Sequence, residues 1–374
     1  MGKVSYTNGF GSIHHTYVSI LLLFLFLATF AYFQYLILSF LTSDTGETVE
    51  GSVLGAKQTM ENLGLEHTFY ENGDDIAEAF PALAGCKGMP YSGVCEDTAG
   101  HIKASKACKA MITAAGDSCE VHTNSKIVSL DVNANAENND VKRICATTED
   151  GLTIMADNCV IAAGPWTNEV LKMADLDALN LKVWEIQWAH YKVKKSVADS
   201  IPQAFHFRKS QTAEDGGLYY VFPASATECI PDLDDGYTYV KVGVDFETRR
   251  GDLEGMETFD YNGDAKVLEL MDGWVKEHLP EVGERIDAYT HPYTMTSDSY
   301  FVMDNVAEGV SLFSGGSGRA FKFAPTIGDM MASLVSGDES PVDLTPFSAK
   351  REALAVEDKK TTAVKEEALE PVAA

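Results

Sequence analysis

The chain has 374 residues, enough to bury a large core in two domains or in one elaborate domain. It carries 29 Lys and Arg against 56 Asp and Glu, and the formal net charge of −27 argues against a nucleic-acid or anionic-membrane surface. The seven cysteines are scattered and include no CxxC pair, which indicates reduced thiols in a reducing compartment rather than a disulfide framework or a zinc site.

The first distinctive stretch is apolar. Residues 18–41 hold no charged side chain, and Gln34 is their only strongly polar member, so the sequence predicts a transmembrane helix here. The stretch is too long for the apolar region of a signal peptide, and no small-x-small cleavage site follows it before Asp44. We expect a membrane location if this segment is genuine, and a soluble intracellular location otherwise.

Ordinary soluble sequence follows the apolar stretch. Apolar residues at helical spacing predict helices, and short alternating or apolar runs between turn residues predict strands. The expected helices are residues 53–63, 102–115, 168–173 and 265–278, and the expected strands are residues 119–123, 127–132, 141–147, 152–155, 159–163, 181–193, 217–223, 237–245 and 286–303. A strand-rich middle flanked on both sides by α/β pieces predicts an α/β (α+β) fold with a second, antiparallel domain inserted into the first.

Residues 310–337 combine an apolar run, a glycine-rich loop and a helical pattern, which predicts a strand, a tight loop and a helix that ends at Gly337. Glycines let backbone N–H groups approach a ligand closely, the helix start favours an anion, and Arg319 and Lys322 add positive charge. The alternative is a strand-to-helix turn with no ligand, because a short glycine pattern alone is weakly specific. Lys322, and Lys241 within a strand pattern, are each also compatible with a side chain that lies along apolar surface.

Other catalytic motifs are absent from the sequence. It contains no GxSxG elbow, HExxH helix, EF-hand loop or GxxxxGK phosphate loop, so we expect no metal. The glycine loop and the isolated lysines therefore remain as the candidate chemistry.

Six ordered segments carry a resemblance to a known family. They are GVCEDTAGHIKASKACKAM (residues 93–111), CVIAAGPWTNEVL (159–171), YYVFP (219–223), YVKVG (239–243), DSYFVMD (298–304) and SGGSGRAFKFAPTIG (314–328). From about residue 51 to residue 351 the chain resembles the flavin-dependent amine oxidases that include sarcosine oxidase, within the D-amino-acid oxidase-like FAD-dependent oxidoreductases.

The resemblance implies that FAD lies between an α/β domain and an antiparallel substrate domain. A secondary amine of a small amino acid would lose a hydride to the flavin, and oxygen would reoxidise the flavin to give hydrogen peroxide. The implied partners are a small-molecule amine or amino-acid substrate and oxygen, with no nucleic acid.

The same resemblance assigns roles to individual residues. Lys241 matches the lysine that activates oxygen, where a fixed positive charge stabilises developing superoxide. Lys322 matches a lysine that binds the substrate carboxylate, and Tyr293 matches an active-site aromatic residue. The positions matched to the cofactor are Gly316, Gly318, Arg319, Ala320, Phe321 and His291 near the flavin, and Ile127, Ala163 and Gly164 near its ADP half.

Three departures from sarcosine oxidase matter. His291 stands where that enzyme has a cysteine bonded to the flavin, so we expect no cysteinyl attachment, and the histidine could attach a flavin, hydrogen-bond to it or be structural. Asp245 and Arg319 replace histidines, which argues against a sarcosine-like substrate. The GxGxxG turn that opens the family's sequences is not found in residues 1–50, so we expect the Rossmann-like FAD-binding domain to be incomplete.

The missing GxGxxG turn favours the hypothesis that residues up to about Thr45 are not native coding sequence, for example a retained intron or a wrong start; a membrane-anchored derivative is the alternative. Two functions follow, an FAD-dependent amine or amino-acid oxidase, or a truncated, non-catalytic membrane-tethered remnant that acts as a binding module. The predicted segments are an apolar N-terminal segment (1–45), the substrate domain (46–100 and 179–288), the FAD-binding domain (101–178 and 289–348) and a mobile tail (349–374).

Overall fold

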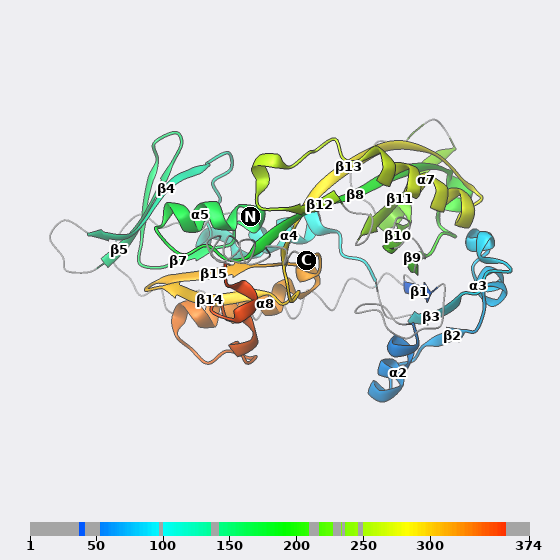
Figure 1. The fold of residues 1–374 in the computed structure, drawn as a ribbon, viewed down its shortest axis with the longest axis horizontal. Coiled ribbons are helices and arrows are strands. Elements are labelled where there is room, and N and C mark those ends of the chain that lie inside the picture. Colours follow the sequence, from blue (N-terminus) through cyan, green and yellow to red (C-terminus); the bar gives the residue numbers. More distant parts are fainter. Residues whose placement is uncertain are drawn as a thin grey trace, which may run out of the picture.

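The fold is mixed α/β. A computed structural model describes residues 37–41, 53–96, 100–135, 142–208, 217–226, 233, 236–245 and 250–356. Figure 1 shows an elongated molecule, with a large sheet in one half, two small sheets in the other, and strands β8 and β13 running between the halves.

Helices form where the apolar spacing predicts them, and two short α-helices, Gly73–Ala79 and Lys195–Ala198, form in addition among the described residues. The α-helices are α2 (Val53–Leu63), α3 (Gly73–Ala79), α4 (Ala104–Ala115), α5 (Thr167–Met173), α6 (Lys195–Ala198), α7 (Ala265–His278) and α8 (Ala324–Ser336), and short 3-10 helices include η2 (Pro81–Cys86), η4 (Gly164–Trp166) and η8 (Ala320–Phe323). The side chain of Asp264 caps the start of α7 by accepting a hydrogen bond from the Lys266 N–H. Gly337 ends α8 in the left-handed conformation, with φ of 75°, as the sequence predicts.

The strands of the described residues assemble into three sheets. They are β1 (Ile37–Leu41), β2 (Thr68–Tyr70), β3 (Ser92–Glu96), β4 (Ile127–Asn135), β5 (Lys142–Thr148), β6 (Thr153–Ala156), β7 (Cys159–Ile161), β8 (Leu181–Lys194), β9 (Gln203–Arg208), β10 (Gly217–Phe222), β11 (Tyr237–Asp245), β12 (Arg250–Leu253), β13 (Val282–Thr296), β14 (Val302–Ala307) and β15 (Val310–Ser314). Over the described residues, the large sheet has the order β12-β8-β11-β10-β9-β1-β3-β2, with β13 also paired to β8. The small sheets have the orders β14-β15-β7 and β4-β5-β6.

One face of the large sheet forms the main core against α7 and η2. Alternate residues of β8, β10 and β11 point to this face, because side chains along a strand have a period of two. Trp274 of α7 stacks on Tyr219, with ring centroids 5.5 Å apart, and its indole N–H donates a hydrogen bond of 2.8 Å to His206 Nδ1. The residues between the core-facing ones therefore lie on the opposite face of the sheet, and they include His190 of β8, Tyr220 of β10 and Lys241 of β11.

Replacing Trp274 with phenylalanine is expected to lower the free energy of unfolding by about 1–3 kcal/mol, because it keeps an aromatic ring but removes the donor to a buried imidazole. Denaturant unfolding measures the loss. The matched change Trp166→Phe, at a side chain that is 43% exposed, should stay within about 0.5 kcal/mol of wild type. Equal effects of the two changes would contradict the prediction.

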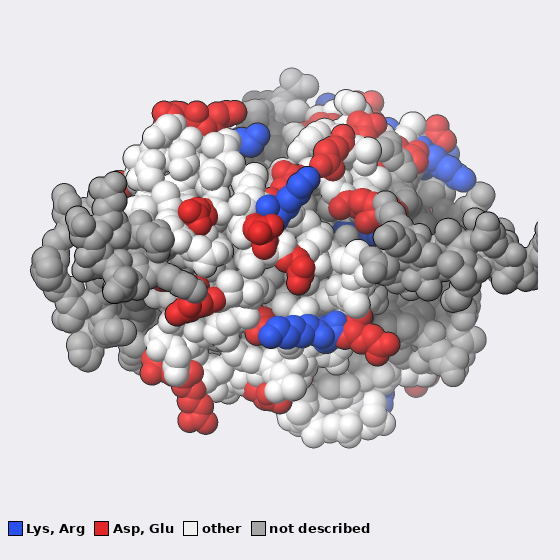
Figure 2. All heavy atoms as spheres, turned by 60° about the vertical axis from the view of Figure 1, so that its left-hand side comes forward, with Lys and Arg blue, Asp and Glu red and all other residues white. Residues whose placement is uncertain are grey.

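The small sheets are covered by two helices. β7 runs parallel to β15, with Ile161 opposite Leu312, and α5 packs over this pair and β4. α8 covers β14 and β15 through Met303, Ile327 and Met330, which confirms the predicted apolar face of this helix. Figure 2 shows acidic side chains spread over the face that it presents, with the visible basic side chains beside acidic ones.

The structure corrects the prediction of a transmembrane helix at the last residues of the predicted segment, 37–41. Ile37–Leu41 form β1, which pairs antiparallel with β3 and parallel with β9. A short apolar run suits a buried strand as well as a helix, so only the strand partners decide between them. Residues 18–36 lie outside the described residues, and none of the described helices is long and apolar enough to cross a membrane.

Two further expectations differ from the structure. Residues 119–123 form no strand. Residues 349–356, expected to begin a mobile tail, are packed: Arg351 donates hydrogen bonds of 2.6 and 3.0 Å to the Asp298 carboxylate, and Leu354 is buried. The charge of Arg351 is thus used in a paired contact, which holds the pKa of Asp298 below its usual range.

Candidate active site

The site lies on the face of the large sheet that turns away from the α7 core. Strand pairing places Lys241 of β11 opposite His190 of β8, and His190 opposite Asp287 of β13. One row further along, Trp188 of β8 lies opposite Tyr289 of β13. Directly opposite residues share a face, so strand order alone gathers these five side chains.

Lys241 is a half-buried cation among aromatic rings. Its Nζ lies 4.3 Å from the centroid of the Trp188 ring and 6.0 Å from that of Tyr220. Burial lowers the pKa of Lys241 to about 8. Its contacts in the described part of the chain are with rings and include no carboxylate, so the ammonium is available to a ligand.

Gly243 lets Tyr220 lie across β11. A Cβ atom at Gly243 would sit 2.2 Å from the Tyr220 ring and its hydroxyl. Burial raises the pKa of Tyr220 well above its ordinary value, and the charges of Tyr293 and Asp245 act in the same direction. Tyr220 therefore stays protonated at neutral pH and can donate a hydrogen bond.

His291 and Tyr293 continue the same face along β13. His291 stacks parallel to Trp188, with centroids 5.6 Å apart, and burial followed by the charge of Lys241 lowers the pKa of His291. Burial, and then Asp245, raises the pKa of Tyr293. Both side chains are therefore neutral at neutral pH.

Tyr293 also joins the sheet to the glycine loop. A Cβ atom at Gly318, where φ is +72°, would lie 2.5 Å from the Tyr293 ring. The Ser317 N–H donates a hydrogen bond of 2.9 Å to the Thr294 carbonyl oxygen. The loop and β13 are thus in direct contact.

The glycine loop and the Gly164 turn lie at one edge of the parallel pair β7 and β15. Both follow the carboxyl ends of their strands, where ligands bind in α/β sheets. The Thr167 hydroxyl bridges them, at 2.7 Å from the Gly164 carbonyl oxygen and 2.8 Å from Ser314 Oγ. Ile127 and Ala163 pack against the same apolar cluster beneath this edge.

The remaining predicted residues lead into α8. The N–H groups of Arg319 and Ala320 donate to the Gly316 carbonyl oxygen at 2.8 and 3.1 Å, which closes the turn before Phe321. Lys322 is exposed, and its Nζ lies 5.8 Å from the Phe323 ring centroid. The structure therefore joins Lys241, His291 and Tyr293 to the loop at Gly318, whereas the described contacts of Lys322 do not reach the sheet.

Sequence reasoning missed Trp188, His190, Asp287 and the pairing of Tyr220 with Gly243. The alternation in WEIQWAHYKVK (residues 184–194) signals a strand with two covered faces, but it names no partner. These residues come together only through the register of β8, β11 and β13.

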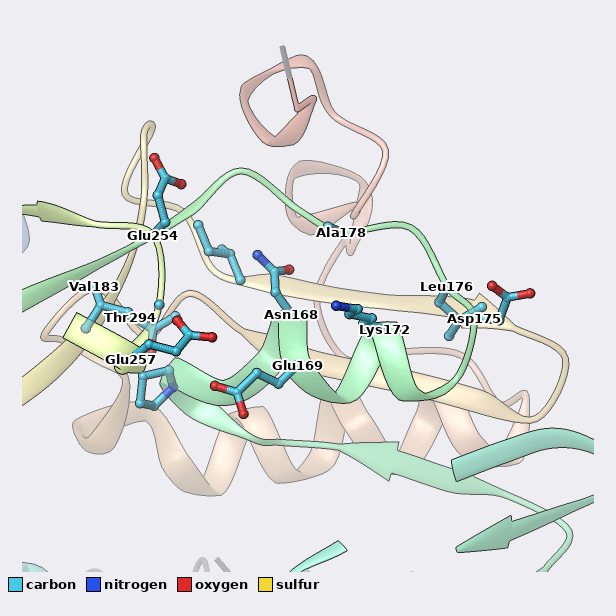
Figure 3. A pocket seen from close by; sticks show the side chains of 13 residues that line it. Asn168, Glu169, Lys172, Asp175, Leu176, Ala178, Val183, Glu254, Glu257 and Thr294 are labelled. Carbon is cyan, nitrogen blue, oxygen red and sulfur yellow. The ribbon is translucent and has the colours of Figure 1, made fainter. Parts of the chain in front are cut away.

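A separate cavity of about 390 Å³ lies between α5, the start of β8 and the segment after β12. Figure 3 shows Asn168, Glu169 and Lys172 on α5, and Glu254 and Glu257 on that segment. Its lining includes Val183 and Thr294, which lie opposite each other in the sheet. Both belong to the face that packs in the core, because Val183 alternates in step with the core residues Ala189 and Tyr191 along β8. It does not include the groups with shifted pKa values, so we do not assign the active site to it.

Comparisons with known proteins agree on a family. A family model described as "DAO: FAD dependent oxidoreductase" matches residues 38–334. N-methyl-L-tryptophan oxidase of Yersinia pestis (strain Pestoides F) is 26% identical over 286 residues, which cover 75% of this chain and 68% of that protein.

Solved structures show the same fold at low sequence identity. NikD, an unusual amino acid oxidase essential for nikkomycin biosynthesis, in its open form, has a TM-score of 0.66 at 19% identity, over 93% of this chain and 86% of NikD. Glycine oxidase from Geobacillus kaustophilus has a TM-score of 0.65 at 16% identity, over 92% of this chain and 85% of that one.

The family match also corrects one expectation. It begins at residue 38, before Thr45, and it includes β1. Residues 38–45 therefore lie within the family match, which argues against the hypothesis that the residues up to about Thr45 are not native coding sequence.

Proposed function

The chain belongs to the DAO family of FAD-dependent oxidoreductases, and from this membership we propose that it oxidises the C–N bond of a secondary amine or N-methyl amino acid, with oxygen as acceptor and hydrogen peroxide as product. The observation that carries the proposal is the half-buried Lys241 ammonium, which lies over the Trp188 ring on a sheet face that Tyr293 joins to the glycine loop. We assign the large sheet to a substrate domain and the small sheets to part of an FAD-binding domain.

The residues fit FAD on the side of its reactive ring system. The positive φ values at Gly315 and Gly318 open a close backbone approach, and Lys241 offers N–H donors that the described residues leave unused. The Gly316 and Gly318 loop, with Arg319, Ala320, Phe321 and His291, would hold the ring system, and Ile127, Ala163 and Gly164 would lie near the ADP half. FAD, when bound, supplies a two-electron acceptor for the hydride of the amine carbon.

The protein's own side chains have distinct roles in this proposal. Lys241 presents positive charge, in a site of low polarity, to the charge that develops on oxygen. Tyr220 and Tyr293 stay protonated and donate hydrogen bonds, and His291 stays neutral and adds no competing positive charge. Lys322, which is exposed on η8, would bind the substrate carboxylate at the mouth of the site.

Flavin reoxidation is expected to slow as the pH rises through about 8, where burial places the pKa of Lys241. Lysine is charged below its pKa and neutral above it, so the fixed charge is present at neutral pH and lost in alkali. Rapid mixing of reduced enzyme with oxygen, from about pH 6 to about pH 10, measures the profile. A rate that stays constant across this range would contradict the role of Lys241.

Flavin absorbance and peroxide formation test the function directly. The chain as written is expressed, its visible spectrum is recorded, and peroxide is measured with N-methyl amino acids, including N-methyl-L-tryptophan, the compound named for the Yersinia relative. We expect a yellow protein that forms peroxide. A folded, colourless protein without activity would instead favour the non-catalytic binding module.

A further inference from the structure

Asp287 and His190 form a fixed pair beside Lys241. Asp287 Oδ1 lies 2.7 Å from His190 Nδ1, and it also accepts the His190 backbone N–H at 3.2 Å. The Tyr289 hydroxyl donates to Asp287 Oδ2 at 3.2 Å. Both oxygens of this carboxylate are therefore occupied on the site face.

A break in strand register places Asp287 there. The pairing of β13 with β8 shifts between Arg285, opposite Tyr191, and Asp287, opposite His190. Such a bulge re-aims side chains, and here the Asp287 carboxylate accepts a backbone N–H of the neighbouring strand. Arg285, before the bulge, is bonded instead to Asp272 of α7, at 2.9 Å.

The state of His190 follows from its partners. A carboxylate accepts, so Nδ1 carries the proton that it donates to Asp287. Burial lowers the pKa of His190, the bond to Asp287 opposes this shift, and the charge of Lys241 adds to it. His190 is thus a neutral ring of fixed orientation at neutral pH.

Trp188 contacts both His190 and Lys241. The His190 ring meets Trp188 edge-on, with centroids 4.9 Å apart and planes at 84°. Tyr289 stacks on Trp188 from β13, at 4.5 Å, and the Lys241 ammonium lies on the indole from β11, at 4.3 Å. Since β8 lies between these two strands, Trp188 is held from both sides.

We propose that Asp287 and His190 are positioning residues for Lys241: Asp287 fixes the imidazole, the imidazole holds Trp188, and Trp188 keeps the half-buried Lys241 ammonium over its ring in the site. The inference rests on the proposed role of Lys241 in the oxidase. It requires no contact of Asp287 or His190 with substrate or flavin.

Other groups on the same face are part of any titration of Lys241. The titratable and charged groups that strand register places on this face are Tyr237, Tyr239 and Asp245 on β11, Tyr220 on β10, Lys182, His190, Lys192 and Lys194 on β8, and Asp287, Tyr289, His291 and Tyr293 on β13. Losing only the negative charge of Asp287 would lower the pKa of Lys241, because a nearby carboxylate favours the ammonium form. Losing the position of Lys241 would raise its pKa, because solvent would then reach the ammonium.

The test is the pH dependence of Lys241 acylation by trace acetic anhydride, read by mass spectrometry. In the wild type we expect a midpoint near pH 8. Asp287→Ala should move it upward by about one pH unit or more, towards the ordinary value for lysine. Asp287→Asn, whose Oδ1 still accepts from His190 Nδ1, should leave it within about 0.3 units or slightly lower.

Controls make the outcome decisive. Glu284→Gln removes one charge from an exposed position on β13 and should change nothing. Labelling of Lys172, which is exposed on α5 in the other half of the molecule, is the internal reference in the same sample. If Asp287→Ala does not fold, His190→Leu, which keeps apolar bulk on β8, should give the same upward shift. An unchanged midpoint, or equal shifts in the Ala and Asn variants, would overturn the proposal.

The labelling needs neither flavin nor turnover. If the protein forms no peroxide but shows the predicted shifts, the positioning role of Asp287 and His190 is supported and the oxidase function is contradicted. If it is an active oxidase without the shifts, the oxidase function is supported and the positioning role is contradicted.

Discussion

Replacing Lys241 with methionine is expected to slow flavin reoxidation by about 10²-fold, while flavin reduction by substrate changes by less than about threefold. Methionine keeps the length of the side chain against Trp188 and Tyr220 but removes the charge. During reoxidation, negative charge develops on oxygen, and the Lys241 ammonium stabilises it. During reduction, hydride transfer from a neutral amine places no charge on oxygen, so this stabilisation plays no part. The two half-reactions should therefore separate.

Anaerobic reduction by substrate and reoxidation by oxygen are measured separately by stopped-flow absorbance. Lys192→Met is the matched control, because Lys192 also lies over a ring in this sheet, 4.4 Å from the Tyr237 centroid, beyond His190. It should leave both half-reactions near wild type. Equal slowing of reduction and reoxidation in Lys241→Met would remove the assigned role.

The alkaline limb of the pH profile should disappear in the same variant. If the limb of the wild type comes from Lys241, methionine leaves no titrating ammonium, and reoxidation becomes slow at every pH. A limb that survives would belong to another group and would contradict the assignment of the profile to Lys241.

Local sequence patterns correctly predicted the helices and strands whose formation does not depend on distant parts of the chain. α2, α7 and β11 have the predicted bounds, because an apolar stripe with a clear stop and a short alternating run are each sufficient locally. β1 could not be predicted in this way. Its five residues are apolar enough for a helix, and their strand state depends on β3 and β9, which lie far along the chain.

The residues of the candidate site also fall into those that were predicted from the sequence and those that were not. Lys241, His291 and Tyr293 were found through a resemblance, which carries residue identities across families without stating their contacts. His190 and Asp287 were not found, because they lie 97 residues apart and meet through a bulge that no local pattern announces. Arg351 was misjudged for a similar reason, since its partner Asp298 lies in a distant turn.

Replacing Gly318 with alanine is expected to weaken FAD binding by about 10- to 100-fold. The backbone there has φ of +72°, which disfavours a side chain, and the new Cβ would lie 2.5 Å from the Tyr293 ring. The loop and the ring cannot both keep their positions. Overpacking of this kind costs about 1–3 kcal/mol, which corresponds to about 5- to 150-fold in affinity and includes the expected range. Titration of the flavin-free protein with FAD, followed by flavin fluorescence, gives the dissociation constant.

Gly328→Ala is the matched control for this prediction. Gly328 lies within α8, shortly after the same loop, and a Cβ there meets nothing within 4 Å. Alanine in a helix interior is favoured over glycine by about 1 kcal/mol, so this variant should bind FAD as the wild type does and unfold at slightly higher temperature. The pair distinguishes a loop that contacts the cofactor from a general effect of added methyl groups. If Gly318→Ala binds FAD as tightly as Gly328→Ala, the glycine loop does not lie against the flavin, and the contact between Tyr293 and Gly318 is structural only.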